Sequence, residues 1–394
     1  MGTTESCDVK VQYERNLILV SSLYPLGGNY GGILQAYALQ RILKQLGFRA
    51  LTIDSNRRFA KIRGALHWGR YCLRRMAFQS QALRPSTKGE LAYREKFTRD
   101  FVSSNISTVD LFGLSGPSRE SLLSEVAAIV VGSDQVWRGG YASLPDQFLK
   151  YAYGLPVRKI SYSASFGSDR LIRFSSRMVK QSRELISEFN AISVREDSAV
   201  EICADVWGKT ADQHVDPTLL LDAHEYIQLA RTAGFSVADS GGGVFAYILD
   251  ESPQVDRVLS DISARLNLTV NRLTLGRTSS IKSESTVAPE QLAPVEEWLE
   301  NFAGADFIVT DSFHGTVFAI IFRKPFLVVG NRDRGLARFE SILRLFGLED
   351  RLVVEGVVPP SVFDFSPNWS VVSEIIKHEQ SRALEYLKIN LGPI

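Results

Sequence analysis

Several features that define large classes of proteins are missing from this chain. Its 394 residues include only three cysteines, Cys7, Cys72 and Cys203, which are widely spaced and form no CxxC pair. This pattern argues against a disulfide framework and against a structural zinc site. No apolar run reaches the roughly 20 residues that span a bilayer, and residues 1–15 lack the apolar segment of a signal peptide. We therefore expect a cytoplasmic protein.

An excess of charge of either sign is also missing. Lys and Arg number 45 and Asp and Glu number 44, which gives a formal net charge of +1. A chain without a net positive field has no broad surface suited to nucleic acid, so we expect no nucleic-acid partner. The chain is too long for one ordinary core, and its 45% hydrophobic residues are enough to fill two. Two domains with a cleft between them are the expected arrangement.

What is present is an alternation of short apolar runs and helical stretches. Residues 17–20 predict a buried strand, residues 33–46 a helix and residues 50–53 a second strand, which together form a βαβ unit. The same alternation continues through residues 127–203 and returns in residues 244–329. It predicts the α/β class, with two parallel sheets covered by helices.

The join between the two domains is expected near residue 215, at a Val-Asp-Pro-Thr segment followed by three leucines. The glycine-rich residues 240–243 are an alternative join. The predicted organisation is an N-terminal domain at 1–215, a C-terminal domain at 216–370, and a final helix within 371–394 that crosses back to the first domain.

The most informative segment is residues 309–316 (VTDSFHGT), where an apolar strand runs into a helix that begins near His314. Backbone N–H groups at a helix start carry partial positive charge and attract anions. Ser312 and Thr310 are both candidates to cap this helix, and Asp311 adds a carboxylate. A phosphate or carboxylate would be held there beside a titratable imidazole, so the segment predicts a site for a small anionic substrate.

A glycine-rich turn follows the first predicted strand. Residues 25–32 place four glycines around Asn29 and Tyr30, just before a helix. Glycines such as Gly31 let a backbone approach a ligand closely, although the spacing is not that of the GxGxxG dinucleotide fingerprint. A binding role and a plain tight turn are both open interpretations.

A second polar set, residues 132–137 (GSDQVW), lies at another strand end, at the edge where open α/β sheets bind ligands. Asp134 is a candidate to accept the proton of a sugar hydroxyl, Gln135 to orient the sugar, and Trp137 to stack on its face. The alternative is a capped helix start with a packed tryptophan.

Arginines follow two further strands. Arg195 comes directly after an apolar strand, and its planar guanidinium suits a carboxylate or phosphate. An ion pair with the neighbouring Glu196 or Asp197 is the simpler account. The loop at 331–338 should lie on the same side of its sheet as His314, where it forms either an anion clamp or a solvated basic loop. The arginines of this loop are Arg332, Arg334 and Arg338.

Residues 55–88 contain nine Lys or Arg and no Asp or Glu. On a helix their apolar side chains fall on one face and their arginines on the other, with Trp68 and Tyr71 near the border. A basic amphipathic helix suits a peripheral contact with the inner face of a membrane. The alternative is an insertion that packs its apolar stripe on its own domain.

In this order, five motifs together resemble the polysaccharide pyruvyl transferase family, over residues 16 to 355. They are 29–32 before an Ala-Tyr-Ala-Leu helix, 132–137, 193–196, 215–218 and 310–315. The resemblance implies a GT-B-like fold, in which two Rossmann-like domains face a cleft. It also implies transfer of the pyruvyl group of phosphoenolpyruvate to two hydroxyls of a sugar, with no metal or other cofactor. The acceptor would be a sugar or a lipid-linked oligosaccharide in exopolysaccharide or cell-surface glycan biosynthesis.

Carried over residue by residue, the resemblance assigns the donor-phosphate histidine to His314, the mid-chain arginine to Arg195 and the downstream basic residue to Arg334. Many members have arginine where this chain has Ser312, so Arg338 or Arg332 would supply the missing contact. The expected donor-binding residues are Arg195, His314, Gly315, Arg334 and Arg338. The expected acceptor-binding residues, in the first domain, are Asn29, Tyr30, Gly31, Gln135 and Trp137. Asp134 and Asp311 are the candidate base and acid, in either order.

Two other functions are compatible with the same motifs. One is a GT-B glycosyltransferase that holds the diphosphate of a nucleotide sugar with helix termini and arginines. The other is a non-catalytic glycan-binding component of a polysaccharide assembly system. The density of charged groups at strand ends disfavours the second, because such groups are costly in a merely structural cleft.

Overall fold

The structure is a computed structural model that describes most of the chain. The described residues are 16–55, 83–85, 87–235, 242–274, 280–282, 291–332, 335–354, 358–364 and 366–392. Most of the basic segment expected at 55–88 lies outside these residues, and so does Arg334. Among the residues that are described, no helix combines the length and the apolar character needed to cross a bilayer.

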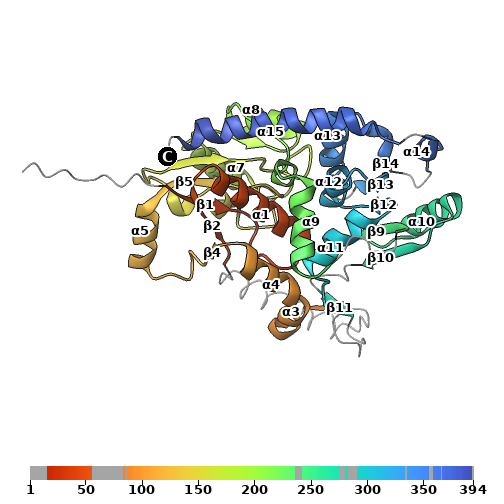
Figure 1. Cartoon of the computed structure of the whole chain (residues 1–394). Helices are drawn as coiled ribbons and strands as arrows, with labels where there is room; N and C mark the ends of the chain where they lie inside the picture. The colour runs from red at the N-terminus through yellow and green to blue at the C-terminus, as the bar shows by residue number, and fades with distance from the viewer. Residues whose placement is uncertain are drawn as a thin grey trace, which may run out of the picture.

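The first domain is built on a five-stranded parallel sheet with the strand order β4-β2-β1-β5-β6 (Figure 1). Its central strands have the sequences LILVS and VAAIVV and are buried along almost their whole length. Such continuous apolar runs form parallel strands because helices cover both faces of the sheet. The strands are β1 (Leu17–Ser21), β2 (Arg49–Ile53), β4 (Thr108–Val109), β5 (Val126–Val131) and β6 (Arg158–Ser161).

Helices and a short strand pair complete the first domain. Strands β7 (Ser193–Val194) and β8 (Asp212–Gln213) pair in parallel, and a bridge between Ile160 and Ala191 joins them to β6. The longer helices are α1 (Tyr30–Gln45), α3 (Lys88–Arg94), α4 (Lys96–Asn105), α5 (Gly116–Glu125), α7 (Ser176–Ile186) and α8 (Asp197–Trp207). The short ones are α6 (Leu144–Gln147) and the 3-10 helix η1 (Lys150–Ala152).

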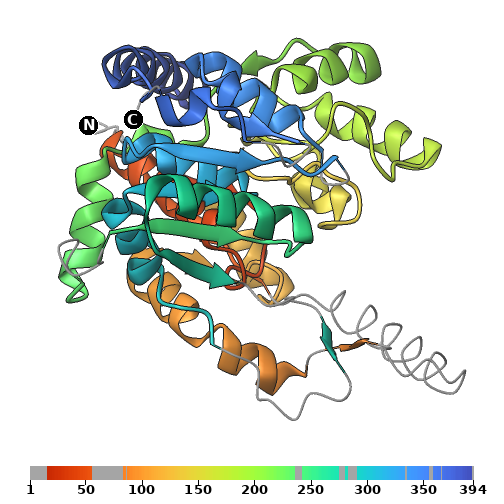
Figure 2. The same ribbon diagram turned by 90° about the vertical axis from the view of Figure 1, so that its right-hand side faces the viewer.

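The second domain repeats the architecture with another parallel sheet, ordered β10-β9-β12-β13-β14 (Figure 2). Its strands are β9 (Val244–Ile248), β10 (Val270–Thr274), β12 (Phe307–Thr310), β13 (Phe326–Val329) and β14 (Leu352–Val353). Its helices are α10 (Pro253–Leu266), α11 (Val295–Gly304), α12 (Phe313–Ile321), α13 (Ala337–Phe346), η5 (Glu349–Arg351) and α14 (Ser361–Asp364). Two parallel sheets with helices on both sides confirm the α/β class predicted from the sequence.

In each sheet the chain changes winding direction between two neighbouring strands. These switch points lie between β1 and β5 in the first domain and between β9 and β12 in the second. Open α/β sheets bind their ligands beyond the carboxyl ends of the strands at such points. The loops that follow β1, β5 and β12 carry the motifs singled out in the sequence.

Several segments join the two domains. The 3-10 helix η2 (Pro217–Leu220) and α9 (Ala223–Thr232) follow β8. Strand β3 (Leu83–Pro85) pairs with β11 (Ser280–Lys282), which comes from the other half of the chain. The long helix α15 (Trp369–Leu391) runs from the second domain back over the first (Figure 1). There the hydroxyl of Tyr386 donates a hydrogen bond to the Ser161 carbonyl at 2.9 Å.

One hydrophobic core continues from the first domain into the second. At the junction the ring of Tyr30, the first residue of α1, stacks on Trp298 of α11 with 5.5 Å between centroids and 16° between planes. The Tyr30 hydroxyl donates to the Ala293 carbonyl at 2.8 Å. This contact fixes the N-terminus of α1 against the second domain, and the candidate site is built around that point.

Candidate functional site

Loops from five strand ends meet where the two sheets face each other. Asn29 follows β1, Asp134 follows β5, and Arg195 follows β7. The other two strand ends are those of β8, which leads to Asp216, and β12, which leads to His314. These residues are far apart in the sequence and come from both domains, so only the folded chain assembles them.

Asp216 is the centre of this assembly. Its Oδ2 accepts hydrogen bonds from Ser133 Oγ at 2.7 Å and from Arg195 Nη1 at 3.1 Å, and it lies 3.5 Å from His314 Nε2. Its Oδ1 accepts from the backbone N–H and the hydroxyl of Thr218 at 3.1 and 2.7 Å. One carboxylate thus connects an arginine of the first domain with the histidine of the second.

The Asp216 side chain has no exposed surface. Burial by itself would raise the pKa of this carboxyl. The charges and hydrogen bonds of His314, Arg195 and Thr218 outweigh burial and hold the pKa well below its usual range. Asp216 therefore stays ionised. From the sequence, Asp216 was predicted only as part of the domain join and of the 215–218 motif, without a role of its own. A lone carboxylate shortly after a strand, in a chain whose other strand ends carry cations, was a usable signal.

His314 lies in the first turn of α12, close to the uncapped start of α1. Ser312 is the capping residue of α12, because its Oγ accepts from the Gly315 N–H at 3.3 Å. The imidazole rests directly on Gly31, where an added Cβ would overlap the ring. Gly315 is similarly required by packing, since a Cβ there would overlap the Thr310 side chain. The structure therefore places His314 against the expected Gly31 turn.

Arg195 and Arg338 approach the same ring, that of Phe313. The guanidinium of Arg195 lies 4.0 Å from the ring centroid and that of Arg338 lies 6.0 Å from it. Both side chains are buried. Burial lowers the pKa of Arg338 to about 10, and the positive charge of nearby Arg195 acts in the same direction. Two cations thus lie against one aromatic ring.

The simpler account of Arg195, an ion pair with its neighbour Glu196, explains little of its environment. The closest approach of the two side chains is 3.9 Å, between Arg195 Nε and Glu196 Oε2. The other oxygen of Glu196 accepts from Ser165 Oγ, the Phe166 N–H and the Gly167 N–H at 2.8 to 3.0 Å. Glu196 therefore mainly stabilises the loop after β6.

Four buried nitrogen atoms of this cluster have no hydrogen-bond partner among the residues that the structure describes. They are Nε and Nη2 of Arg195, Nε of Arg338 and Nε2 of His314. Buried donors on charged groups are costly when they are left unpaired. An anion with several oxygen atoms would satisfy them, so the cluster has the chemistry of an anion site.

Asp134 lies on the first-domain side of this cluster. Its Oδ2 accepts from Asn29 Nδ2 at 3.3 Å, and its Oδ1 accepts from the Gln135 N–H at 2.8 Å. Its backbone has φ 74°, a left-handed conformation that is uncommon for a residue other than glycine and that turns the chain sharply at the end of β5. Asn29 is exposed and Gln135 half-buried, so a ligand can reach both. The structure thus brings together Asn29, Asp134 and Gln135.

Two of the expected acceptor-binding residues need correction. Trp137 is fully buried, and its ring stacks on Phe148 at 5.3 Å and 8° and meets Trp207 edge-on. No face of its indole is available to a sugar, so the alternative of a packed tryptophan holds. Tyr30 is also fully buried, and its hydroxyl is used at the domain junction. Both residues stabilise the core.

Asp311 has both of its carboxylate oxygens engaged by the loop after β9. Its two oxygens accept from the backbone N–H groups of Leu249 and Asp250 at 2.7 and 2.8 Å. The carboxylate therefore fixes the loop after β9. Asp134 is the better placed of the two candidate carboxylates. Within the same described residues, no group of His, Cys, Asp and Glu side chains has the arrangement of a metal site.

Solved structures resemble the chain over nearly its whole length at low identity. A protein from Listeria monocytogenes assigned as a UDP-N-acetylglucosamine 2-epimerase is 8% identical, with a TM-score of 0.51 over 95% of this chain and 96% of that one. The N-terminal domain of Candida albicans trehalose-6-phosphate phosphatase is 11% identical (TM-score 0.48; 95% and 98% covered). The UDP-GlcNAc 2-epimerase of Methanocaldococcus jannaschii is 12% identical (TM-score 0.44; 92% and 91% covered). The likeness to the Listeria monocytogenes protein, together with the two parallel sheets, confirms the GT-B-like fold.

Sequence comparison gives the family. No curated protein sequence matches the chain. The profile of one family, described as polysaccharide pyruvyl transferase, matches residues 29–334. That span runs from the glycine-rich turn to the loop after β13 and includes Asp134, Arg195, Asp216 and His314. On this match, the chain belongs to the polysaccharide pyruvyl transferase family.

Proposed function

We propose that this protein transfers the pyruvyl group of phosphoenolpyruvate to two hydroxyls of a sugar, forming a cyclic ketal during exopolysaccharide or cell-surface glycan biosynthesis. The observation that carries the proposal is the set of unpaired, buried nitrogen atoms on Arg195, Arg338 and His314. Phosphoenolpyruvate offers a carboxylate and a phosphate, and both groups suit such donors.

Donor binding is assigned to the cationic cluster. The free Nε and Nη2 of Arg195 form one edge of its guanidinium, which suits two parallel bonds to a carboxylate or phosphate. Nε of Arg338 and Nε2 of His314 would complete the contacts. Asp216 holds Arg195 in place through Nη1, and its carboxylate lies 3.5 Å from His314 Nε2. These preorganised charges would stabilise the phosphate as it departs.

The chemistry requires one proton donor and one proton acceptor at defined points. A proton adds to the methylene carbon of the enol and leaves positive character at C2. The first sugar hydroxyl then attacks C2 and loses its proton. Phosphate then leaves C2, the second hydroxyl attacks C2 and closes the ketal ring, and the proton of this hydroxyl ends on the released phosphate. The products are the pyruvylated sugar and inorganic phosphate. We assign the acceptor of the hydroxyl proton to Asp134, which lies beside the exposed Asn29.

The test is a direct assay. The protein is incubated with phosphoenolpyruvate and a panel of galactosyl, glucosyl and mannosyl acceptors, free and lipid-linked. We expect one acceptor to gain the mass of one pyruvyl ketal while an equal amount of phosphate is released. Transfer of a sugar from UDP- or GDP-linked donors under the same conditions, without ketal formation, would establish the nucleotide-sugar glycosyltransferase instead.

A further inference from the structure

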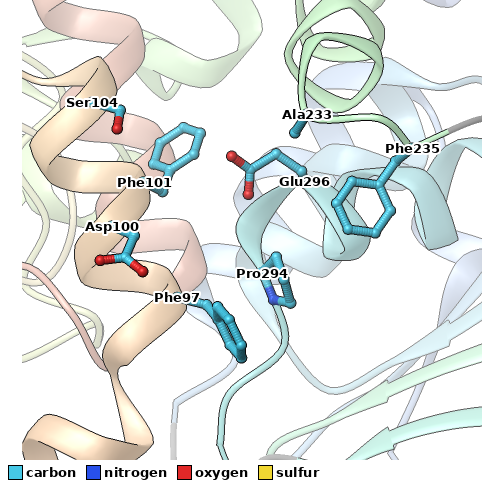
Figure 3. A pocket seen from close by; sticks show the side chains of 8 residues that line it. All are labelled: Phe97, Asp100, Phe101, Ser104, Ala233, Phe235, Pro294 and Glu296. Atoms are coloured by element: carbon cyan, nitrogen blue, oxygen red, sulfur yellow. The ribbon is translucent and has the colours of Figure 1, made fainter.

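A pocket that shares no residue with the cationic cluster lies where α4, α9 and α11 converge (Figure 1). It has a volume of about 210 Å³. Its walls come from both domains, since α4 belongs to the first and α11 to the second. The lining residues are Phe97, Asp100, Phe101, Ser104, Ala233, Phe235, Pro294 and Glu296 (Figure 3).

The pocket combines aromatic rings with carboxylates. Phe97 and Phe101 lie on α4, and Phe235 follows α9 on the opposite side. Figure 3 shows the Glu296 carboxylate directed into the space between the helices, toward Phe101. Asp100 places a second carboxylate on the α4 side. None of the lining side chains is positively charged.

Glu296 is an unusual residue for this position. It is partly buried, and burial raises the pKa of its carboxyl, with only its own backbone N–H acting in the opposite direction. No other side chain within the described residues pairs with this carboxylate. A helix N-terminus favours a negative charge, but Glu296 also lies among three phenyl rings, where an unpaired carboxylate is unfavourable.

We propose that this pocket binds a small organic cation whose ammonium group is quaternary or methylated. Phenyl faces attract such cations through their negative π-electron density, and the two carboxylates supply the compensating charge. A methylated ammonium group suits the pocket because it needs few hydrogen-bond acceptors. Lys96 Nζ lies 5.5 Å from the centroid of the Phe97 ring, so a cation can be accommodated beside this ring.

The pocket is also connected to the candidate active site by direct contacts. Pro294 follows Ala293, whose carbonyl accepts the hydrogen bond of Tyr30. Tyr30 precedes Gly31, on which His314 rests. A cation bound between α4 and α11 would stabilise the contact between the two domains at this point. The proposal of cation binding does not depend on the reaction that the protein catalyses.

The experiment compares choline with 3,3-dimethylbutan-1-ol, a neutral molecule of nearly the same shape, by isothermal titration calorimetry on the full chain. We expect saturable binding of choline, and binding of the neutral analogue that is at least about tenfold weaker. Glu296→Gln should weaken choline binding by a similar factor, because it keeps the side-chain shape and removes the charge. Glu297→Gln, on the next residue of the same helix, is the matched control.

Every outcome decides the proposal. No saturable heat with choline, equal binding of the two ligands, or equal effects of Glu296→Gln and Glu297→Gln would each overturn it. Circular dichroism and melting curves show whether the variants are folded. Phe101→Leu gives a second approach, since it keeps an apolar wall and removes a ring face, and it should weaken choline more than the neutral analogue. An equal loss for both ligands would count against the proposal.

Discussion

At the scale of single residues, the most consequential side chain is Asp216. It is fully buried, and its carboxylate is shared between Arg195 and His314. Removing one member of a buried ion network leaves the others uncompensated, which costs more than the network itself contributes. Asp216 is therefore expected to affect both the stability of the fold and the orientation of the donor-binding groups.

Asp216→Asn should lower the free energy of unfolding by about 3 kcal/mol and pyruvyl transfer by on the order of 10². The amide keeps the shape of the side chain but loses the charge that holds Arg195 and His314. Urea denaturation and phosphate release measure the two effects. Asp205→Asn, on the exposed face of α8, is the control. Equal values for the two variants would show that Asp216 is not an organising residue.

Gly31→Ala tests the contact between the first turn of α1 and the imidazole. The new methyl group would overlap the His314 ring, so the ring must leave its present position beside Asp216. We expect transfer activity to fall by on the order of 10², because even a small displacement of a group proposed to act on the donor is costly. His314→Ala should have a similar effect. Gly89→Ala in α3 is the control, since a Cβ there meets nothing within 4 Å. Wild-type kinetics in Gly31→Ala would contradict this placement of His314.

At the scale of secondary-structure elements, α15 is attached to the first domain through a buried histidine. His214 lies after β8, with its ring 6.0 Å from Tyr162 and 4.7 Å from Tyr386 of α15. Its Nδ1 is 2.9 Å from Ser193 Oγ. Burial, reinforced by the positive charge of Arg382, lowers the pKa of His214 to about 4. The neutral ring is therefore the form that the folded protein holds.

This predicts a stability profile with a definite direction. The unfolded chain binds a proton at His214 near the ordinary pKa of about 6.5, whereas the folded chain does so only near 4. The stability that the neutral His214 ring contributes is therefore fully present above pH 6.5. It is lost as the pH falls toward 4, by on the order of 3 kcal/mol. When the free energy of unfolding is measured with denaturant at several pH values between 4 and 8, it should fall less steeply toward low pH for His214→Gln than for the wild type. His378→Gln on α15 is the control. The same pH dependence of the free energy of unfolding in all three proteins would refute the prediction.

At the scale of the whole molecule, the proposed anion site draws on both domains and on the loop between them. A ligand that binds only the folded protein raises its stability, by about 2.7 kcal/mol at a concentration of 100 times its dissociation constant. We expect phosphoenolpyruvate to raise the melting temperature more than inorganic phosphate does, because it fills the carboxylate position as well. Arg195→Ala should abolish the difference. A larger shift with UDP or GDP than with phosphoenolpyruvate would favour the glycosyltransferase.

Much of this molecule was predictable from the sequence, and the exceptions have physical reasons. Strands β1, β5 and β12 were identified because parallel strands buried on both faces are continuous apolar runs. Trp137 was placed wrongly because position at a strand end does not determine which way a side chain points. Helices α3 to α5 were not anticipated, although Thr87 and Glu90 form a capping box that the sequence displays.

Asp216 illustrates why the site could be predicted only in part. Its partners Ser133, Arg195 and His314 lie before and after it along the chain, and their contact depends on how the two sheets meet. The motifs identified which strand ends carry charge, but not that one carboxylate joins them. The same is true of the unpaired guanidinium nitrogens, because only the folded structure shows that the Arg195 guanidinium packs against Phe313.

The ring stack of Tyr30 on Trp298 has a practical consequence for engineering. Hybrid enzymes that take one half from one relative and the other half from a second would bring together aromatic surfaces that were not selected for each other. Swapping whole halves would therefore endanger solubility and folding before it changed sugar preference. Grafting the short loops after β1 and β5 leaves this aromatic contact between the domains intact and is the safer route to new specificity.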